Sequence, residues 1–182
     1  DDIPAFLATD VCQLGILGQN GLLEKQALGN GKFAGLRQLL LLCYGRCRLS
    51  IAVPHDFDYQ SIKSLNGKVI ATSYKGLLAQ YLADCKIDAD IVTMEGAVEV
   101  APRTHLADVI CDLVSTGSTL VSNGLVEKDI ILQSQAVLVT NQIDDQEIAT
   151  LAEKVTSRIK AVLRAENSRY IMLNSPIDSL EA

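Results

Sequence analysis

The sequence predicts an α/β protein in which mostly parallel sheets are flanked by helices. Aliphatic runs of strand length alternate with amphipathic stretches of helical period, and this alternation is typical of parallel sheets covered on both faces. The chain has 182 residues, 48% hydrophobic and 21% charged, which is enough for one sizeable domain or two small lobes. Because aromatic residues make up only 4% and tryptophan is absent, we expect an aliphatic core.

The chain should begin with a short helix and a buried strand. Asp2 and Pro4 predict the N-cap and the first-turn proline of a helix that ends near Thr9. A buried strand is expected over Cys12–Leu17, ended by a polar turn made of Gly18, Gln19 and Asn20. A polar turn after a strand can hold a ligand in an open α/β sheet. A plain surface turn explains these three residues equally well.

The rest of the chain repeats the alternation. Further strands are expected over Leu36–Leu42, Arg48–Val53, Lys68–Ser73, Ile87–Met94, Ala107–Val114, Asp129–Leu132, Ala136–Thr140 and Tyr170–Leu173. Helices are expected over Gly76–Cys85, from about Thr119, and over Gln146–Asn167. The last helix is the clearest, because its apolar residues recur every three or four positions and predict one stripe that faces a core, namely Ile148, Leu151, Val155, Ile159, Val162 and Leu163.

The strongest candidate for a ligand site is the loop after Ala107–Val114. A loop between a strand and a helix start leaves backbone N–H groups unpaired, and the helix dipole makes that spot positive. Gly117 lets the backbone approach a ligand, and hydroxyls come from Ser115, Thr116, Ser118 and Thr119. This pattern favours a phosphate site, with an ordinary capped turn as the alternative. Asp112, at the end of the strand, suits sugar hydroxyls or a magnesium ion.

Composition argues against several other classes. The net charge is −6 and no basic run is present, so we expect no nucleic-acid partner. No stretch reaches the ~20 apolar residues of a membrane span, and the Gly-x-x-x-x-Gly-Lys-Ser/Thr pattern of P-loop proteins is missing. The five cysteines lie mostly in apolar runs, as reduced buried thiols do, which predicts a cytoplasmic protein.

The stretch Glu99–Leu120 resembles the signature of ATP phosphoribosyltransferase, the first enzyme of histidine biosynthesis. The residues that fit are Glu99, Ala107, Ile110, Asp112, Leu113, Val114, Thr116, Gly117, Thr119 and Leu120. One position departs, because His105 stands where the family usually has glycine. The similarity extends through Gly15–Gly18, Cys47–Ser50, Leu65–Lys68, Ile70–Tyr74 and Ser168–Met172.

This resemblance implies a two-lobed fold similar to that of type II periplasmic binding proteins. Residues 1–46 would start lobe I, residues 47–133 would form lobe II with the phosphate-binding loop, and residues 134–182 would return to lobe I. It also implies that an N-terminal strand and helix of lobe I, and the C-terminal regulatory domain of the long form, lie outside this sequence. The ending resembles the long form of the family.

The resemblance further implies the reaction of ATP with phosphoribosyl pyrophosphate, with Mg²⁺, to give phosphoribosyl-ATP and pyrophosphate. Residues Ser115–Thr119 would hold the 5′-phosphate, and Asp112 and Glu99 would orient ribose hydroxyls, with Asp112 able to hold Mg²⁺ through water. Residues 18–20 would lie at the nucleotide end of the cleft. No general base is assigned, because adenine N1 attacks without one, and Arg48 and Lys68 are candidates for gripping pyrophosphate.

The implied partners are further copies of the chain, since the family forms dimers that assemble further, up to a hexamer. Histidine would inhibit only if the regulatory domain is present. An alternative from another class is a two-lobed module that binds a small phosphate ester and performs no chemistry, because this fold is shared with such proteins.

Overall fold

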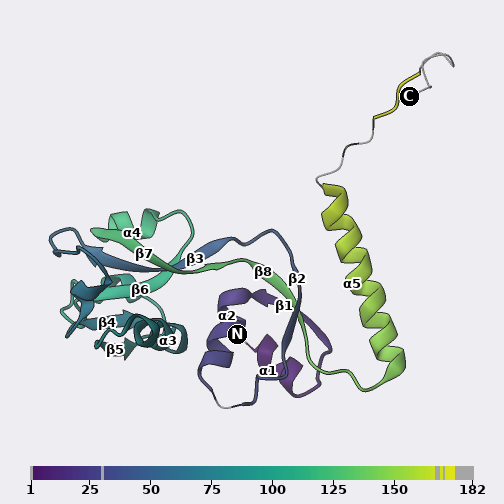
Figure 1. Cartoon of the computed structure of the whole chain (residues 1–182), viewed down its shortest axis with the longest axis horizontal. Helices are drawn as coiled ribbons and strands as arrows, with labels where there is room; N and C mark the ends of the chain where they lie inside the picture. Colours follow the sequence, from purple (N-terminus) through teal and green to yellow (C-terminus); the bar gives the residue numbers. More distant parts are fainter. Residues whose placement is uncertain (1, 30, 167–168, 170, 175–182) are drawn as a thin grey trace.

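The computed structural model describes residues 2–29, 31–166, 169 and 171–174, whose strands form two separate sheets (Figure 1). The smaller sheet has the strand order β1-β8-β2. Its strands are β1 (Leu14–Gly18), β8 (Ala136–Thr140) and β2 (Arg37–Leu41). The larger sheet has the order β5-β4-β6-β3-β7. Its strands are β5 (Asp90–Thr93), β4 (Val69–Thr72), β6 (Val109–Val114), β3 (Cys47–Pro54) and β7 (Leu125–Ser134).

The expectation of mostly parallel sheets is wrong. In the part of the chain that the structure describes, β4 makes the only parallel pairings, with β5 and β6. Strand β3 is antiparallel to both β6 and β7, and β8 is antiparallel to both β1 and β2. The path between the sheets accounts for two of these pairings. The chain leaves the small sheet through β2 and β3 and returns through β7 and β8, so β3 and β7, and likewise β2 and β8, run in opposite directions.

The strands divide between the sheets close to the expected lobe boundaries. The large sheet uses strands between residues 47 and 134, and the small sheet uses strands between 14 and 41 and between 136 and 140. The boundaries 1–46, 47–133 and 134–182 themselves stay a prediction. A single residue, Gln135, separates β7 from β8. We refer below to the part built on the small sheet as lobe I and to the part built on the large sheet as lobe II.

Helices flank both sheets. They are α1 (Ile3–Ala8), α2 (Gln19–Ala27), α3 (Lys75–Cys85), α4 (Ser118–Ser122) and α5 (Gln146–Glu166), with 3₁₀ turns at Ile62–Leu65 and Val98–Val100. Helix α1 begins as predicted with Pro4 in its first turn, although Asp2 makes no capping hydrogen bond through its side chain. The polar turn expected over residues 18–20 is wrong, because Gly18 still belongs to β1 and α2 starts directly at Gln19.

The core is aliphatic, as the composition predicts. Strand β3 shows how the pleat divides it, because successive side chains point to opposite faces of a sheet. Leu49, Ile51 and Val53 pack on one face with Leu78 of α3. Ala52 packs on the other face in a cluster that includes Ile110. None of the fully buried hydrophobic residues described is aromatic.

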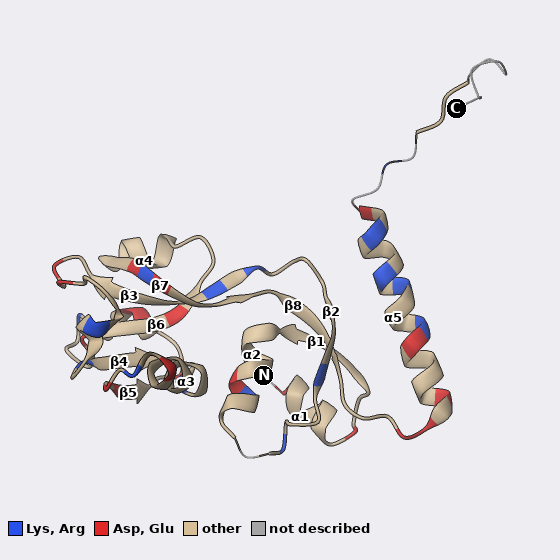
Figure 2. Ribbon diagram, in the orientation of Figure 1, with Lys and Arg blue, Asp and Glu red and all other residues tan. Residues whose placement is uncertain are grey.

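Helix α5 lies beside the small sheet at the edge of the molecule, with acidic and basic residues interspersed along it (Figures 1 and 2). Ile159 and Leu163 pack against a cluster of Leu42, Ala136 and Leu138. The rest of its apolar stripe is open to solvent, with Leu151 60% exposed. The expectation that the whole stripe faces a core is therefore wrong.

The predicted last strand is also wrong, because Ile171–Leu173 has no regular structure. Tyr170, the first residue of that predicted strand, and Asn167, the predicted end of the long helix, lie outside the described residues. No helix in the described ranges combines the length and the apolarity that crossing a bilayer requires.

Candidate functional site

The carboxyl ends of the three parallel strands meet at one edge of the large sheet. Strands β4, β5 and β6 end at Thr72, Thr93 and Val114, and a polar loop follows each of them. The loops after β4 and β5 are joined, since the Ser73 hydroxyl donates to the Met94 carbonyl oxygen at 2.7 Å. Open α/β sheets bind ligands at this edge. The predicted phosphate-binding loop, residues 115–119, follows β6 and so lies there.

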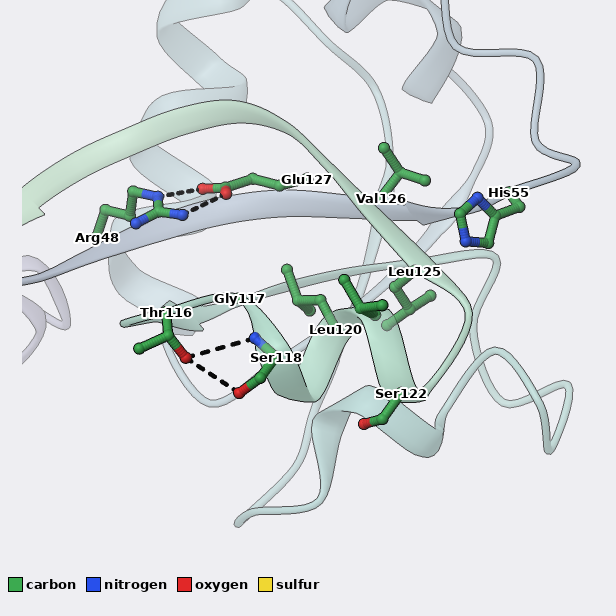
Figure 3. Close-up of a pocket in the computed structure, with 11 residues that line it drawn as sticks. Arg48, His55, Thr116, Gly117, Ser118, Leu120, Ser122, Leu125, Val126 and Glu127 are labelled. Carbon is green, nitrogen blue, oxygen red and sulfur yellow. Dashed lines mark hydrogen bonds and ion pairs between the residues drawn. The ribbon is translucent and has the colours of Figure 1, made fainter.

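The geometry of this loop depends on Gly117, whose φ is +85°. An added Cβ would meet nothing closer than 3.8 Å, so the left-handed backbone and not crowding favours glycine here. The Thr116 and Ser118 hydroxyl oxygens lie 3.0 Å apart, and the Ser118 N–H donates weakly to Thr116 Oγ1 at 3.5 Å (Figure 3). The side chains of Ser115, Thr116, Ser118 and Thr119 are all exposed. The loop thus presents its hydroxyls to solvent.

Arg48 of β3 braces the start of the loop. Its guanidinium makes a two-pronged ion pair with Glu127 of β7, at 2.5 and 2.6 Å (Figure 3). The Ser50 hydroxyl donates to the same carboxylate at 2.7 Å. Arg48 Nη1 also donates to the Ser115 carbonyl oxygen at 3.2 Å. Because a carbonyl and the next N–H point in opposite directions from one planar peptide, this contact turns the Thr116 N–H away from Arg48.

The two basic candidates for gripping pyrophosphate differ in position. Arg48 is held by Glu127, and this hydrogen bond lowers the pKa of the Glu127 carboxyl. Lys68 lies just before β4, at the opposite end of the parallel strands from the loop, with its Nζ 5.7 Å from the centre of the Phe57 ring. An open hollow of about 760 Å³ lies beside the loop, and its lining includes Arg48, His55, Thr116, Gly117 and Ser118 (Figure 3).

Asp112 is a half-buried carboxylate on β6, three residues before the loop. Burial raises its pKa, the Leu113 N–H that donates to Asp112 Oδ1 at 2.8 Å opposes this, and the charge of Glu99 adds to it. The predicted residues Asp112 and Glu99 are therefore near enough to repel each other. Among the described residues no three acidic, histidine or cysteine side chains form a metal cluster. Mg²⁺ bound together with substrate phosphates needs only one or two carboxylates, which this pair can supply.

Of the predicted nucleotide-end residues, Gly18 and Asn20 lie together, and Gln19 makes a different contact. Asn20 is buried in the first turn of α2, and its side-chain amide donates to the Tyr74 hydroxyl at 2.8 Å. Burial raises the pKa of Tyr74, the hydrogen bond from Asn20 lowers it, and the negative charge of Asp112 raises it further. Gln19 instead donates its N–H to the Gln135 carbonyl at 2.9 Å.

Gly18 lies against Asn20, because a Cβ added at Gly18 would lie 2.5 Å from Asn20 Oδ1. Both residues line a small hollow of about 90 Å³ in lobe I, together with residues of α1 and with Lys25. Sequence reasoning missed Tyr74 as a member of the site. Its position directly after a parallel strand, at the same edge as the predicted loop, is the signal that could have found it.

The departure at His105 has a local explanation. Its φ is +55°, the Leu106 N–H donates to the Ala101 carbonyl at 3.0 Å, and the His105 N–H donates to the Pro102 carbonyl at 3.2 Å. This is the pair of bonds of a Schellman motif, with His105 at the left-handed position that glycine usually occupies. The chain adopts the turn that a glycine would favour, without the glycine.

Comparisons with solved structures define the class of fold. The chain resembles XAC2383 from Xanthomonas citri bound to ATP, with a TM-score of 0.62 at 15% identity over 88% of this chain and 66% of that one. It also resembles an ABC transporter/periplasmic binding protein from Brucella ovis with glutathione bound, with a TM-score of 0.58 at 16% identity over 91% and 52%. These likenesses confirm the two-lobed α/β fold of the periplasmic-binding-protein type.

The family follows from closer matches. The ATP phosphoribosyl transferase (HisG:HisZ) complex from Thermotoga maritima matches with a TM-score of 0.75 at 25% identity, covering 90% of this chain and 76% of that one. An ATP phosphoribosyltransferase of Maricaulis maris (strain MCS10) is 44% identical over 185 residues, covering 100% of this chain and 62% of that protein. The family model HisG, ATP phosphoribosyltransferase, matches residues 1–161. The chain belongs to the ATP phosphoribosyltransferase family and spans about three fifths of that relative's length.

Proposed function

We propose that this chain carries the phosphoribosyl-binding site of an ATP phosphoribosyltransferase, which joins ATP to phosphoribosyl pyrophosphate in the first step of histidine biosynthesis. The observation that carries the proposal is the loop of residues 115–119. It combines the family signature with a left-handed Gly117, exposed hydroxyls and a position at the carboxyl end of β6. We assign the 5′-phosphate to this loop.

In the reaction, N1 of adenine forms a bond to C1 of the ribose, and the bond from C1 to pyrophosphate breaks with its electron pair leaving on oxygen. Binding both reactants in one orientation supplies much of the rate in such a step. Hydroxyls and N–H groups of residues 115–119 hold the phosphate, and Asp112 and Glu99 orient the ribose hydroxyls. No general base is needed, since N1 carries a free electron pair.

Asp112, together with Glu99, would hold Mg²⁺, since the charge of Glu99 adds to the raised pKa of Asp112 and a cation would relieve this repulsion. The ion would supply positive charge that stabilises the leaving pyrophosphate. A half-buried Asp112 is better placed to hold such an ion through water together with the substrate phosphates than as one member of an all-protein cage.

We place the nucleotide on the side of Tyr74 that faces α2, where Asn20 of lobe I is hydrogen-bonded to Tyr74 of lobe II. We propose that the chain functions in the cytoplasm as a homo-oligomer, a dimer that assembles into a hexamer. The T. maritima relative was solved as a HisG:HisZ complex, which favours assembly with further chains. Histidine would act as an inhibitor only through the regulatory domain of the long form.

Calorimetric titration with ribose 5-phosphate, and with phosphoribosyl pyrophosphate plus Mg²⁺, tests the loop. The control for Gly117→Ala is Gly67→Ala. Gly67 also has a left-handed backbone, with a φ of +69° and open space around it, but it lies before β4, at the other end of the parallel strands. Both variants should lose similar stability. Only Gly117→Ala, together with Thr116→Val, should weaken binding, by about tenfold or more if one or two phosphate hydrogen bonds are lost.

Equal affinities in Gly117→Ala and Gly67→Ala would refute the loop assignment. The transferase reaction itself is tested by release of pyrophosphate from the two substrates, using the full-length protein. Binding of ribose 5-phosphate without any such release would favour the alternative, a two-lobed module that binds phosphate esters and performs no chemistry.

A further inference from the structure

Two polar side chains of α2 cross from lobe I to lobe II. Asn20 and Glu24 are four residues apart and so lie on one face of the helix. Each is only 8% exposed, although both are polar. Buried polar groups are costly unless they are hydrogen-bonded, and here the partners of both include groups at the start of α3. Helices α2 and α3 lie below the strands that join the two sheets (Figure 1).

Glu24 caps α3 from the other lobe. Its two carboxylate oxygens accept the Gly76 N–H at 2.8 Å and the Leu77 N–H at 2.9 Å. The first amides of a helix have no partner within the helix, and the positive end of the helix dipole favours a carboxylate. The residue before the helix, Tyr74, makes no capping hydrogen bond through its side chain. The cap of α3 is therefore supplied by α2.

Close packing supports this contact. A Cβ added at Gly76 would lie 3.0 Å from the Ala27 Cβ, 3.1 Å from the Leu28 N and 3.2 Å from Glu24 Oε2. Two of these atoms belong to the end of α2 or the residue after it. The missing side chain at Gly76 thus lets the start of α3 approach α2 closely enough for both carboxylate bonds.

Asn20 extends the contact to the candidate site. Its side-chain amide donates to the Tyr74 hydroxyl at 2.8 Å, its carbonyl oxygen accepts the Ser134 hydroxyl at 2.8 Å, and its backbone N–H donates to Ser134 Oγ at 3.0 Å. Ser134 is the last residue of β7, next to the return of the chain to lobe I. Thr72, two residues before Tyr74, pairs with Cys111, the residue before Asp112, so Tyr74 and Asp112 lie at the same edge of the large sheet.

We infer that Asn20 and Glu24 are positioning residues that clamp the two lobes together and hold Tyr74 beside Asp112. Separating the lobes at this point leaves a carboxylate, two helix amides and an asparagine side chain without their partners. The clamp therefore fixes the distance between α2 and the carboxyl edge of the large sheet. Its effect on substrate binding rests on the proposed function, whereas the clamp itself does not.

Amide hydrogen exchange measured by NMR, without ligand, tests the clamp. In Glu24→Gln the side chain keeps its size but places an NH₂ group against one of the two amides. Exchange at Gly76 and Leu77 should quicken by about tenfold, as expected for a lost hydrogen bond to a charged group. Leu78 serves as an internal reference, because its N–H is bonded to the Tyr74 carbonyl within the helix.

The matched control is Glu147→Gln, which removes an acidic side chain from the first turn of α5, at a position exposed to solvent. It should leave Gly76 and Leu77 unchanged. Unchanged exchange at these two amides in Glu24→Gln as well would overturn the clamp. If Glu24→Gln unfolds, Asn20→Ser gives a second test. The expected result is faster exchange of the backbone amide at position 20, or an increased radius of gyration in solution scattering.

The positioning role has a separate readout. The dissociation constant of phosphoribosyl pyrophosphate with Mg²⁺ should rise several-fold in Glu24→Gln and stay unchanged in Glu147→Gln, at a temperature where both are folded. Faster exchange with an unchanged dissociation constant would overturn the positioning role. Absence of binding in the unmodified protein would instead contradict the proposed function, and the exchange result would stand by itself.

Discussion

Replacing His105 by glycine should stabilise the protein. The residue is exposed, and its φ of +55° puts it at the left-handed position of a Schellman turn. A non-glycine residue in this conformation costs about 1–2 kcal/mol. Glycine loses more backbone entropy on folding, which offsets about 0.4–1 kcal/mol of that gain. The net increase in the free energy of unfolding should therefore be about 0.5–1 kcal/mol.

Urea denaturation measures this change as a shift of the midpoint at an unchanged slope. For a chain of this length, 1 kcal/mol corresponds to a melting-temperature shift of about 2–4 °C. His105→Ala keeps the backbone constraint and should change little. Lys86→Gly, at a φ of +58° after α3, should stabilise in the same way. Asp84→Gly, inside α3, should instead lose about 0.3 kcal/mol, because aspartate is itself a weak helix former.

The result that would refute the reasoning is a lower stability of His105→Gly than of the unmodified protein. It would mean that the imidazole makes a stabilising contact worth more than the backbone strain. A gain of equal size in His105→Ala would also contradict it, since alanine does not relieve the left-handed conformation.

Three further predictions concern Asp112, Glu127 and Leu78. Burial raises the pKa of Asp112 above 3.8, so the stability of the folded protein falls as pH rises through the folded pKa and the carboxyl becomes charged. Thermal denaturation at neutral pH should therefore show Asp112→Asn to be more stable than the unmodified protein. The same variant should bind phosphoribosyl pyrophosphate with Mg²⁺ more weakly. The hydrogen bond from Arg48 lowers the pKa of Glu127 below 4.5, so the stability that this pair contributes is present above pH 4.5 and is lost as pH falls through the folded pKa. In Glu127→Gln the free energy of unfolding should therefore fall less steeply as the pH is lowered. An unchanged pH dependence would contradict the assignment. Leu78→Ala leaves a cavity where α3 packs on the large sheet and should cost about 2–5 kcal/mol in urea denaturation, whereas a loss below about 1 kcal/mol would show that the core closes around it.

Local sequence determined much of the framework of this protein. Most strands and helices lie within a few residues of their predicted ranges, because each carries its own periodicity and its own turn residues. The position of the loop of residues 115–119 after a buried strand was also readable, since its glycine and hydroxyl residues are local signals. The aliphatic core followed from composition alone.

Contacts between distant residues were decided only by the tertiary structure. Arg48 forms an ion pair with Glu127, 79 residues later in the chain, and Asn20 is hydrogen-bonded to Ser134, 114 residues later. Glu24 caps a helix that begins about 50 residues after it. Nothing in the local pattern specifies such pairs, because a charged or amide side chain fits a solvated surface equally well. The same limit explains the directions of the crossing strands, because they depend on how the chain passes between the two sheets, and this path is a property of the whole fold.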